Sequence, residues 1–76
     1  MVTVYSKPSC VQCTATYRRL DAKGISYKIL DVSQDEEALD KIKSLGHLQA
    51  PVVVTVDSNW SGFRPDLIDE LATRIS

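Results

Sequence analysis

The chain has 76 residues, a net charge of −1 and 43% hydrophobic residues. This length suits one domain, and the nearly neutral charge provides no basic surface for nucleic acid. No apolar run approaches the ~18 residues that span a membrane, and the first residues lack a signal-peptide pattern. We therefore expect a single domain over residues 1–76, monomeric and cytoplasmic, with no nucleic-acid or membrane partner.

The first half of the chain predicts a strand, a helix and a second strand. Residues Val2–Ser6 alternate β-branched and aromatic side chains, which is typical of a buried strand. After a turn, Ser9 is expected to cap a helix over residues 10–23, and Gly24 ends that helix. A second strand is expected over residues 25–32.

The second half predicts a helix, two short strands and a final helix. Ser33 and Glu36 form a capping box that opens the second helix, which Gly46 ends. A loop over residues 47–51 precedes a third strand over 52–56, and a short fourth strand starts at Trp60. Pro65 then opens the last helix. Its apolar face comprises Leu67, Ile68, Leu71, Ala72 and Ile75.

This order of elements determines the expected architecture. The first strand, helix and second strand form a parallel unit, whereas the last two strands are close enough in sequence to pair as an antiparallel hairpin. The expected fold is therefore α/β: a minimal thioredoxin fold with a four-stranded mixed sheet flanked by three helices on both faces.

The chain contains two cysteines, Cys10 and Cys13, at the junction of the first strand and the first helix. Their spacing puts both on the same side of the helix start, near enough for a disulfide. Free N–H groups, the helix dipole and nearby Lys7 favour a thiolate at Cys10, while Cys13 faces inward. The pattern predicts a redox-active disulfide without a bound cofactor, in which Cys10 attacks a target disulfide and Cys13 resolves the product.

A metal site is the alternative interpretation of this cysteine pair. Zinc requires four ligands, and His47 is the one further residue among the cysteines and histidines. We interpret His47 as an ordinary loop residue. A metal or iron–sulfur centre that two chains share remains a remote alternative.

Pro51 comes directly before the third predicted strand. In a thioredoxin-like fold this proline is cis and lies against the redox pair. The backbone of Ala50 is then exposed to an extended substrate. The alternative is a trans proline that simply begins a strand.

The segment from Trp60 to Arg64 places two aromatic side chains and a cation around Gly62, just before the last helix. Gly62 permits a tight turn, and Ser61 or the helix N-terminus could bind an anion. Trp60 is expected to pack at least partly, whereas Phe63 fits a core role and a partner-facing role equally well. On the first helix, Arg18 and Arg19 are expected on a solvated face.

Two motifs together resemble those of NrdH-redoxins, which are glutaredoxin-like in sequence: Cys10-Val11-Gln12-Cys13 and the segment from Trp60 to Asp66. The resemblance implies a cytoplasmic electron donor that reduces the large subunit of class Ib ribonucleotide reductase. It also implies that thioredoxin reductase recharges the protein with electrons from NADPH. The residues expected to bind substrates or partners are Lys7, Val11, Gln12, Ala50, Pro51, Trp60, Ser61, Gly62, Phe63 and Arg64.

The chain departs from glutathione-dependent glutaredoxins at three places. Val11-Gln12 replaces the usual Pro-Tyr between the cysteines, and Gln49-Ala50 replaces Thr-Val before the proline. Residues 61–64 replace a Gly-Gly turn with paired acids. Most groups that would hold glutathione are therefore missing, and a glutathione-dependent glutaredoxin is the alternative function.

Overall fold

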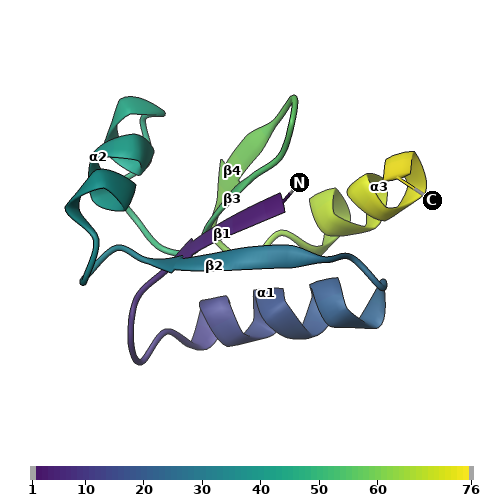
Figure 1. Ribbon diagram of the computed structural model, residues 1–76. Coiled ribbons are helices and arrows are strands. Elements are labelled where there is room, and N and C mark those ends of the chain that lie inside the picture. Colours follow the sequence, from purple (N-terminus) through teal and green to yellow (C-terminus); the bar gives the residue numbers. More distant parts are fainter. Residues whose placement is uncertain (1, 76) are drawn as a thin grey trace.

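The computed structural model describes residues 2–75, and the side chain of Ile75 lies outside the described part. The elements follow the expected order (Figure 1): β1 (Val2–Ser6), α1 (Val11–Ala22), β2 (Tyr27–Asp31), α2 (Glu36–Ser44), β3 (Val52–Val54), β4 (Asn59–Ser61) and α3 (Pro65–Ile75). Within residues 2–75, none of the helices has the length and apolar character to cross a membrane.

The four strands form one mixed sheet in the order β2-β1-β3-β4. Strand β1 runs parallel to β2, with Val4 opposite Ile29, and antiparallel to β3, with Val4 opposite Val53. Strands β3 and β4 pair as an antiparallel hairpin in which Val53 faces Trp60. The predicted mixed sheet is therefore confirmed.

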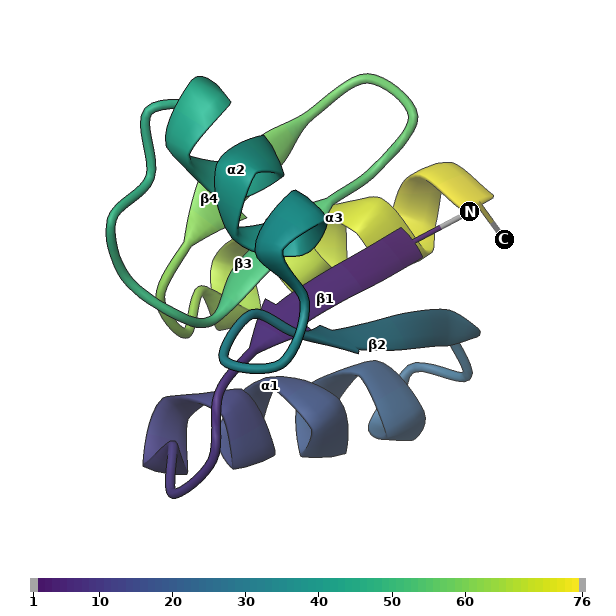
Figure 2. The ribbon, with the colours of Figure 1, turned by 60° about the vertical axis from the view of Figure 1, so that its left-hand side comes forward.

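The sheet has a core on each face, because successive strand residues point to opposite sides. Helices α1 and α3 cover one face and α2 covers the other; in Figure 2, α2 lies in front of the sheet and α3 behind it. The first core contains Val2, Val4, Leu20, Ile25, Val53, Trp60, Ile68 and Leu71. The second contains Tyr5, Ala38, Ile42 and Val52. The expected thioredoxin fold, with helices on both faces, is confirmed.

The first helix begins differently from the prediction. Ser9 has a φ of +58°, in the left-handed region, so it cannot serve as the extended N-cap residue. The N-cap is Cys10, whose sulfur accepts a hydrogen bond of 3.1 Å from the backbone N–H of Cys13. The prediction of a Ser9 cap was wrong because the chain needs one more residue to turn out of β1.

The second helix also begins later than the capping box predicted. Its N-cap is Asp35, whose carboxylate accepts a 3.1 Å hydrogen bond from the N–H of Ala38. Ser33 instead donates its hydroxyl to Asp31 over 2.6 Å, within the turn after β2. The N-cap role predicted for Ser33 therefore belongs to Asp35, whose carboxylate lies nearer the first turn of the helix.

Two strands are shorter than predicted. Strand β2 starts at Tyr27 because the N–H of Ile25 still donates to the carbonyl of Leu20, 3.0 Å away, and closes the end of α1. Strand β3 ends at Val54, where the turn between Thr55 and Ser58 begins.

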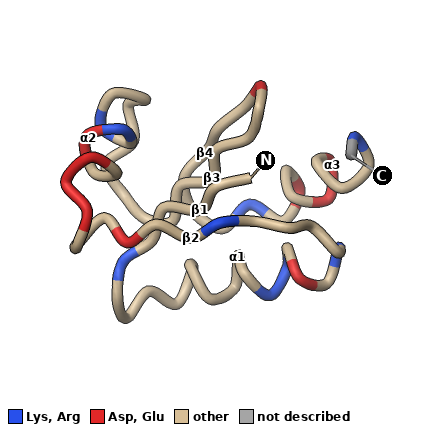
Figure 3. The backbone as a smooth tube through the Cα atoms, in the orientation of Figure 1, with Lys and Arg blue, Asp and Glu red and all other residues tan. Residues whose placement is uncertain are grey.

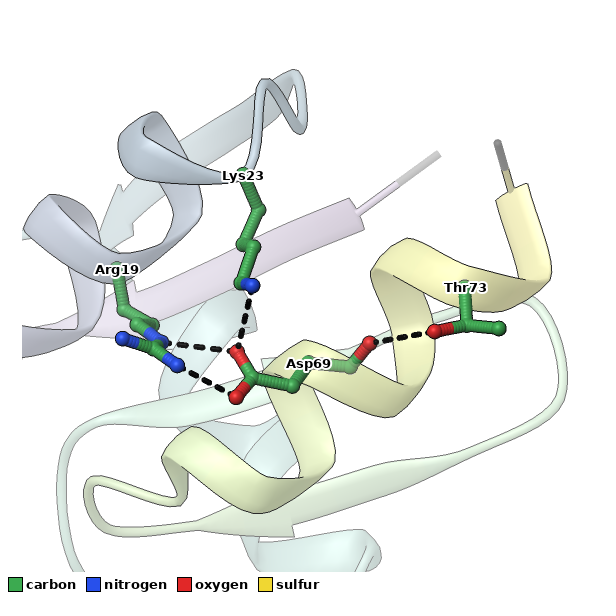
Figure 4. A network of polar contacts seen from close by, with 4 residues as sticks. All are labelled: Arg19, Lys23, Asp69 and Thr73. Carbon is green, nitrogen blue, oxygen red and sulfur yellow. Dashed lines mark hydrogen bonds and ion pairs between the residues drawn. The ribbon is translucent and has the colours of Figure 1, made fainter.

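An ion-pair network joins α1 to α3 (Figure 4). Arg19 Nε donates to Asp69 Oδ1 over 2.8 Å, and Lys23 Nζ lies 3.6 Å from the same oxygen. The hydrogen bond from Arg19 holds the pKa of the Asp69 carboxyl below its usual value. The expectation of a merely solvated Arg19 is therefore wrong, because α3 places an acid directly against it.

Candidate active site

Cys10 and Cys13 form a disulfide at the start of α1, with their Cα atoms 5.2 Å apart. The turn after β1, with Ser9 in the left-handed conformation, carries the chain into the helix at this point. Cys10 is half-buried, whereas Cys13 is 2% exposed. Of the two sulfurs, the one on Cys10 is therefore the more accessible to another molecule.

The helix start places a backbone hydrogen-bond donor against the sulfur of Cys10. Its sulfur accepts the N–H of Cys13, and the positive end of the α1 dipole lies at the same place. Once the disulfide is reduced, both features favour a thiolate at Cys10. Within residues 2–75, the sulfur of buried Cys13 accepts no such backbone hydrogen bond. Lys7 is exposed and lines the same hollow as Cys10, where its positive charge also favours an anion.

The Ala50–Pro51 peptide bond is cis, which confirms that prediction. Pro51 is fully buried, and its carbonyl accepts the N–H of Gly62 over 2.8 Å. A Cβ atom added to Gly62 would lie 3.6 Å from Gln12 Oε1. The start of β3, the residue after β4 and the first turn of α1 therefore meet at one place. Contact between Pro51 and the sulfurs stays a prediction.

The two aromatic side chains after β4 have separate locations. Trp60 is 7% exposed and packs in the core between the sheet and helices α1 and α3. The expectation that Trp60 packs is therefore confirmed, because the β4 register turns its ring inward opposite Val53 and leaves little of it exposed to a partner. Phe63 is 37% exposed and remains available at the surface.

Arg64 is engaged within its own loop. Its Nε and Nη2 atoms donate to the two carboxylate oxygens of Asp66 over 3.2 and 3.0 Å. The hydrogen bond from Arg64 lowers the pKa of the Asp66 carboxyl, and the backbone N–H of Leu67 lowers it further. An internal carboxylate thus occupies the beginning of α3, where the sequence suggested an anion site.

The other residues predicted to contact a substrate or partner differ in their exposure to solvent. Val11 is 84% exposed, Gln12 is exposed, and the remaining three are half-buried: Ala50, Ser61 and Gly62. The side chain of His47 contacts a residue outside this group: its Nε2 atom lies 2.6 Å from Asn59 Oδ1. Within residues 2–75, no cluster of three or more His, Cys, Asp or Glu side chains could hold a metal.

Two adjoining hollows flank the redox pair and share Val11 and Thr14. The smaller, of about 420 Å³, is lined by Lys7, Ser9, Cys10, Val11, Cys13, Thr14 and Tyr17. The larger, of about 550 Å³, is lined by Val11, Thr14, Ala15, Arg18, Arg19, Ala22 and Phe63. Sequence reasoning missed the role of Thr14 and Ala15, although small side chains on the outward face of a helix indicate such a hollow.

The family model described as Glutaredoxin matches residues 2–59. The glutaredoxin-like protein NrdH of Escherichia coli K12 is 40% identical over 70 residues, which cover 92% of this chain and 86% of that protein. NrdH of Lactococcus lactis subsp. cremoris is 36% identical over 72 residues, covering 95% and 100%. The chain belongs to the glutaredoxin-like NrdH family.

Solved structures agree with this family assignment. The NrdH-redoxin of E. coli, described as having a thioredoxin-like activity profile, superposes with a TM-score of 0.88 at 40% identity, covering 92% of each chain. Glutaredoxin 1 of Archaeoglobus fulgidus gives a TM-score of 0.75 at 25% identity, covering 92% and 83%. As an NrdH-type protein, this chain is a thiol–disulfide oxidoreductase, and its redox-active group is the Cys10–Cys13 disulfide.

Proposed function

We propose that this NrdH-type protein carries electrons from thioredoxin reductase, charged by NADPH, to the large subunit of class Ib ribonucleotide reductase. It acts in the cytoplasm as a single-domain monomer. The observation that carries the proposal is the half-buried Cys10 at the start of α1, followed by the exposed side chain of Val11, which lines a hollow together with Phe63. Such a surface suits a protein partner.

The reaction follows from the different surroundings of the two cysteines. The Cys10 thiolate attacks one sulfur of the partner disulfide, and the partner's other sulfur leaves as a thiolate that takes up a proton. Cys13 then loses its proton and attacks the Cys10 sulfur, which breaks the mixed disulfide. The partner leaves with two thiols, two electrons have moved, and the Cys10–Cys13 disulfide is restored.

The charges around the site favour a protein over glutathione as electron donor. Glutathione carries two carboxylates, which require well-placed cations or N–H donors. Arg64 is already paired with Asp66, and Arg19 with Asp69. Two cations beside the redox pair form no ion pair within residues 2–75, but these two, Lys7 and Arg18, line different hollows and do not form one site for both carboxylates. The match to the glutaredoxin family model keeps a glutathione-dependent activity as the second candidate function.

The test compares two ways of reducing the oxidised protein. One arm uses NADPH with thioredoxin reductase, and the other uses NADPH, millimolar glutathione and glutathione reductase. We expect much faster reduction in the first arm, and multiple turnovers when class Ib ribonucleotide reductase is added. Equal or faster reduction by glutathione would instead make this protein a glutathione-dependent glutaredoxin.

A further inference from the structure

The nine Lys and Arg residues of the chain, whose positions Figure 3 marks in blue, differ in their surroundings. Arg19, Lys23, Arg64 and Arg74 each form an ion pair with an aspartate. Lys7 and Arg18 line the hollows beside the redox pair, and neither forms an ion pair or side-chain hydrogen bond within residues 2–75. These two positive charges are therefore free to meet a negatively charged partner.

Arg18 and Arg19 are neighbours in sequence but have different surroundings. Arg19 is held by Asp69 of α3, whereas Arg18 is exposed on the outward face of α1. Asp21, three residues further along the helix, accepts the hydroxyl of Tyr27 over 2.9 Å and is thereby turned toward β2. Within the described residues, Arg18 therefore forms no ion pair with Asp21 or with any other acid.

The outward face of α1 forms a groove with Phe63 as its other wall. Helical spacing brings the outward residues into line, and three of them have small side chains, which leaves the hollow between Val11 and Arg18. We call this the α1 groove; it comprises Val11, Thr14, Ala15, Arg18, Arg19, Ala22 and Phe63, and of its two arginines Arg19 is paired with Asp69. Its end nearest the redox pair is apolar, and Arg18 contributes the charge further along.

The dimensions of the α1 groove suit an extended peptide. Cys10 and Arg18 are eight residues apart, which is about 12 Å along a helix at a rise of ~1.5 Å per residue. An extended chain covers this distance in about four residues, at ~3.3 Å each. A carboxylate about four residues from an attacked cysteine would therefore reach Arg18.

We propose that the α1 groove binds an extended, acidic segment of the protein that carries the target disulfide. In this arrangement an apolar side chain next to the attacked cysteine packs on Val11 and Phe63, and a carboxylate about four residues away pairs with Arg18. The inference rests on the proposed function, which makes Cys10 the attacking group. It adds Arg18 as a residue that determines which protein disulfides are reduced quickly.

The test uses short peptides with one cysteine, held as a mixed disulfide with 2-mercaptoethanol. The parent peptide has a leucine next to the cysteine and a glutamate four residues away, and its partners carry glutamine or lysine instead of the glutamate. Stopped-flow mixing with the reduced protein measures the second-order rate of reduction. Since an exposed ion pair contributes up to about 1 kcal/mol, we expect the glutamate peptide to react up to about fivefold faster than the glutamine peptide at low salt. The difference should largely disappear at ~1 M salt.

Matched variants distinguish the effect of a local contact with Arg18 from the effect of the protein's net charge. Arg18→Glu should reverse the preference in favour of the lysine peptide, and Arg18→Gln should abolish it. Lys28→Glu changes the net charge by the same amount as Arg18→Glu, but Lys28 lies on β2 outside the groove. The preference should therefore survive in Lys28→Glu. Melting temperatures of all variants establish that each is folded.

The outcomes distinguish this inference from the proposed function. Equal effects of Arg18→Glu and Lys28→Glu would overturn the inference, as would a wild-type protein that reduces all three peptides equally fast. In both cases rapid reduction of the glutamine peptide would leave the thiol–disulfide function intact. If the wild type reduced none of the peptides and also failed with ribonucleotide reductase, the proposed function itself would be wrong.

Discussion

The backbone N–H of Gly62 donates a 2.8 Å hydrogen bond to the carbonyl of Pro51. This bond joins the residue after β4 to the residue before β3, directly beside the side chain of Gln12. Gly62 has a φ of +82°, which residues with a Cβ atom rarely adopt. The loop that carries Phe63 is thus held to the redox site by a backbone conformation that favours glycine.

Replacement of Gly62 by alanine should lower the free energy of unfolding by about 1–2 kcal/mol, the cost of the left-handed conformation for such a residue. It should also slow reduction of protein disulfides, because the loop beside the site must adjust. Gly46→Ala is the control, since Gly46 has a φ of +87° and open space around its Cα. Urea unfolding and reduction kinetics measure both effects. If the two variants slowed the reaction equally, the site-specific role of Gly62 would be refuted.

Cys10→Ser should abolish disulfide reduction, because the accessible sulfur at the helix start is lost. Cys13→Ser should instead accumulate a mixed disulfide between Cys10 and the target, detectable by mass spectrometry, because the resolving thiol is missing. In the reduced wild type, iodoacetamide should modify Cys10 faster than the buried Cys13 at neutral pH. Faster modification of Cys13, together with an active Cys10→Ser variant, would reverse the assigned roles.

Asp69→Asn should lower the melting temperature at pH 7, because Arg19 and Lys23 lose their common partner. The folded protein holds the pKa of Asp69 below its usual value, so this carboxylate stabilises the fold above pH ~4 and loses that effect as pH falls further. The gap in melting temperature between wild type and variant should therefore shrink toward pH 2. Asp40→Asn, on α2 without an ion pair among residues 2–75, should show no comparable trend. A gap independent of pH would contradict this account.

Ser9→Gly should raise the stability slightly. Glycine removes a left-handed strain of about 1 kcal/mol but costs about 0.5 kcal/mol of backbone entropy, which leaves a net gain of about 0.5 kcal/mol. For a domain of this size that corresponds to about 2–4 °C in melting temperature. A lower melting temperature would mean that the Ser9 side chain makes a stabilising contact that outweighs the strain.

The two aromatic residues after β4 should respond differently to truncation. Trp60→Ala removes a buried core side chain and should lower the free energy of unfolding by about 3–5 kcal/mol. Phe63→Ala should cost less than about 1 kcal/mol, because Phe63 is partly exposed, yet it should raise the KM for a protein disulfide. Chemical denaturation and steady-state kinetics measure these values. A large stability loss in Phe63→Ala would assign this side chain to the core.

The element order and the two-sided core could be predicted from the sequence, because alternating and helical apolar patterns depend on local residues. The residues at which the helices begin could not be predicted in this way. At α1, Ser9 has the usual chemistry of a cap, but the backbone turn gives that role to the sulfur of Cys10. Conventional capping preferences do not include cysteine, so the sequence carried no signal for this bond.

The features of the site that depend on residues close to the cysteines in sequence could be predicted. The features that depend on α3 and on the register of β4 could not. Arg18 and Arg19 look equivalent in the sequence, and only the position of Asp69 on α3 separates them. Trp60 could have faced either side of the sheet, because the register of a three-residue strand is not encoded in so short a pattern.

The ion pair between Arg19 and Asp69 affects the binding of a partner protein. Helix α1 carries Cys10 at its start, and α3 begins two residues after Phe63, so the pair connects the helices that carry the two sides of the α1 groove. Their separation is established when the chain folds, before any partner arrives. For the acidic segment that we propose to bind in the α1 groove, the conformational entropy lost on association would then fall mainly on that segment.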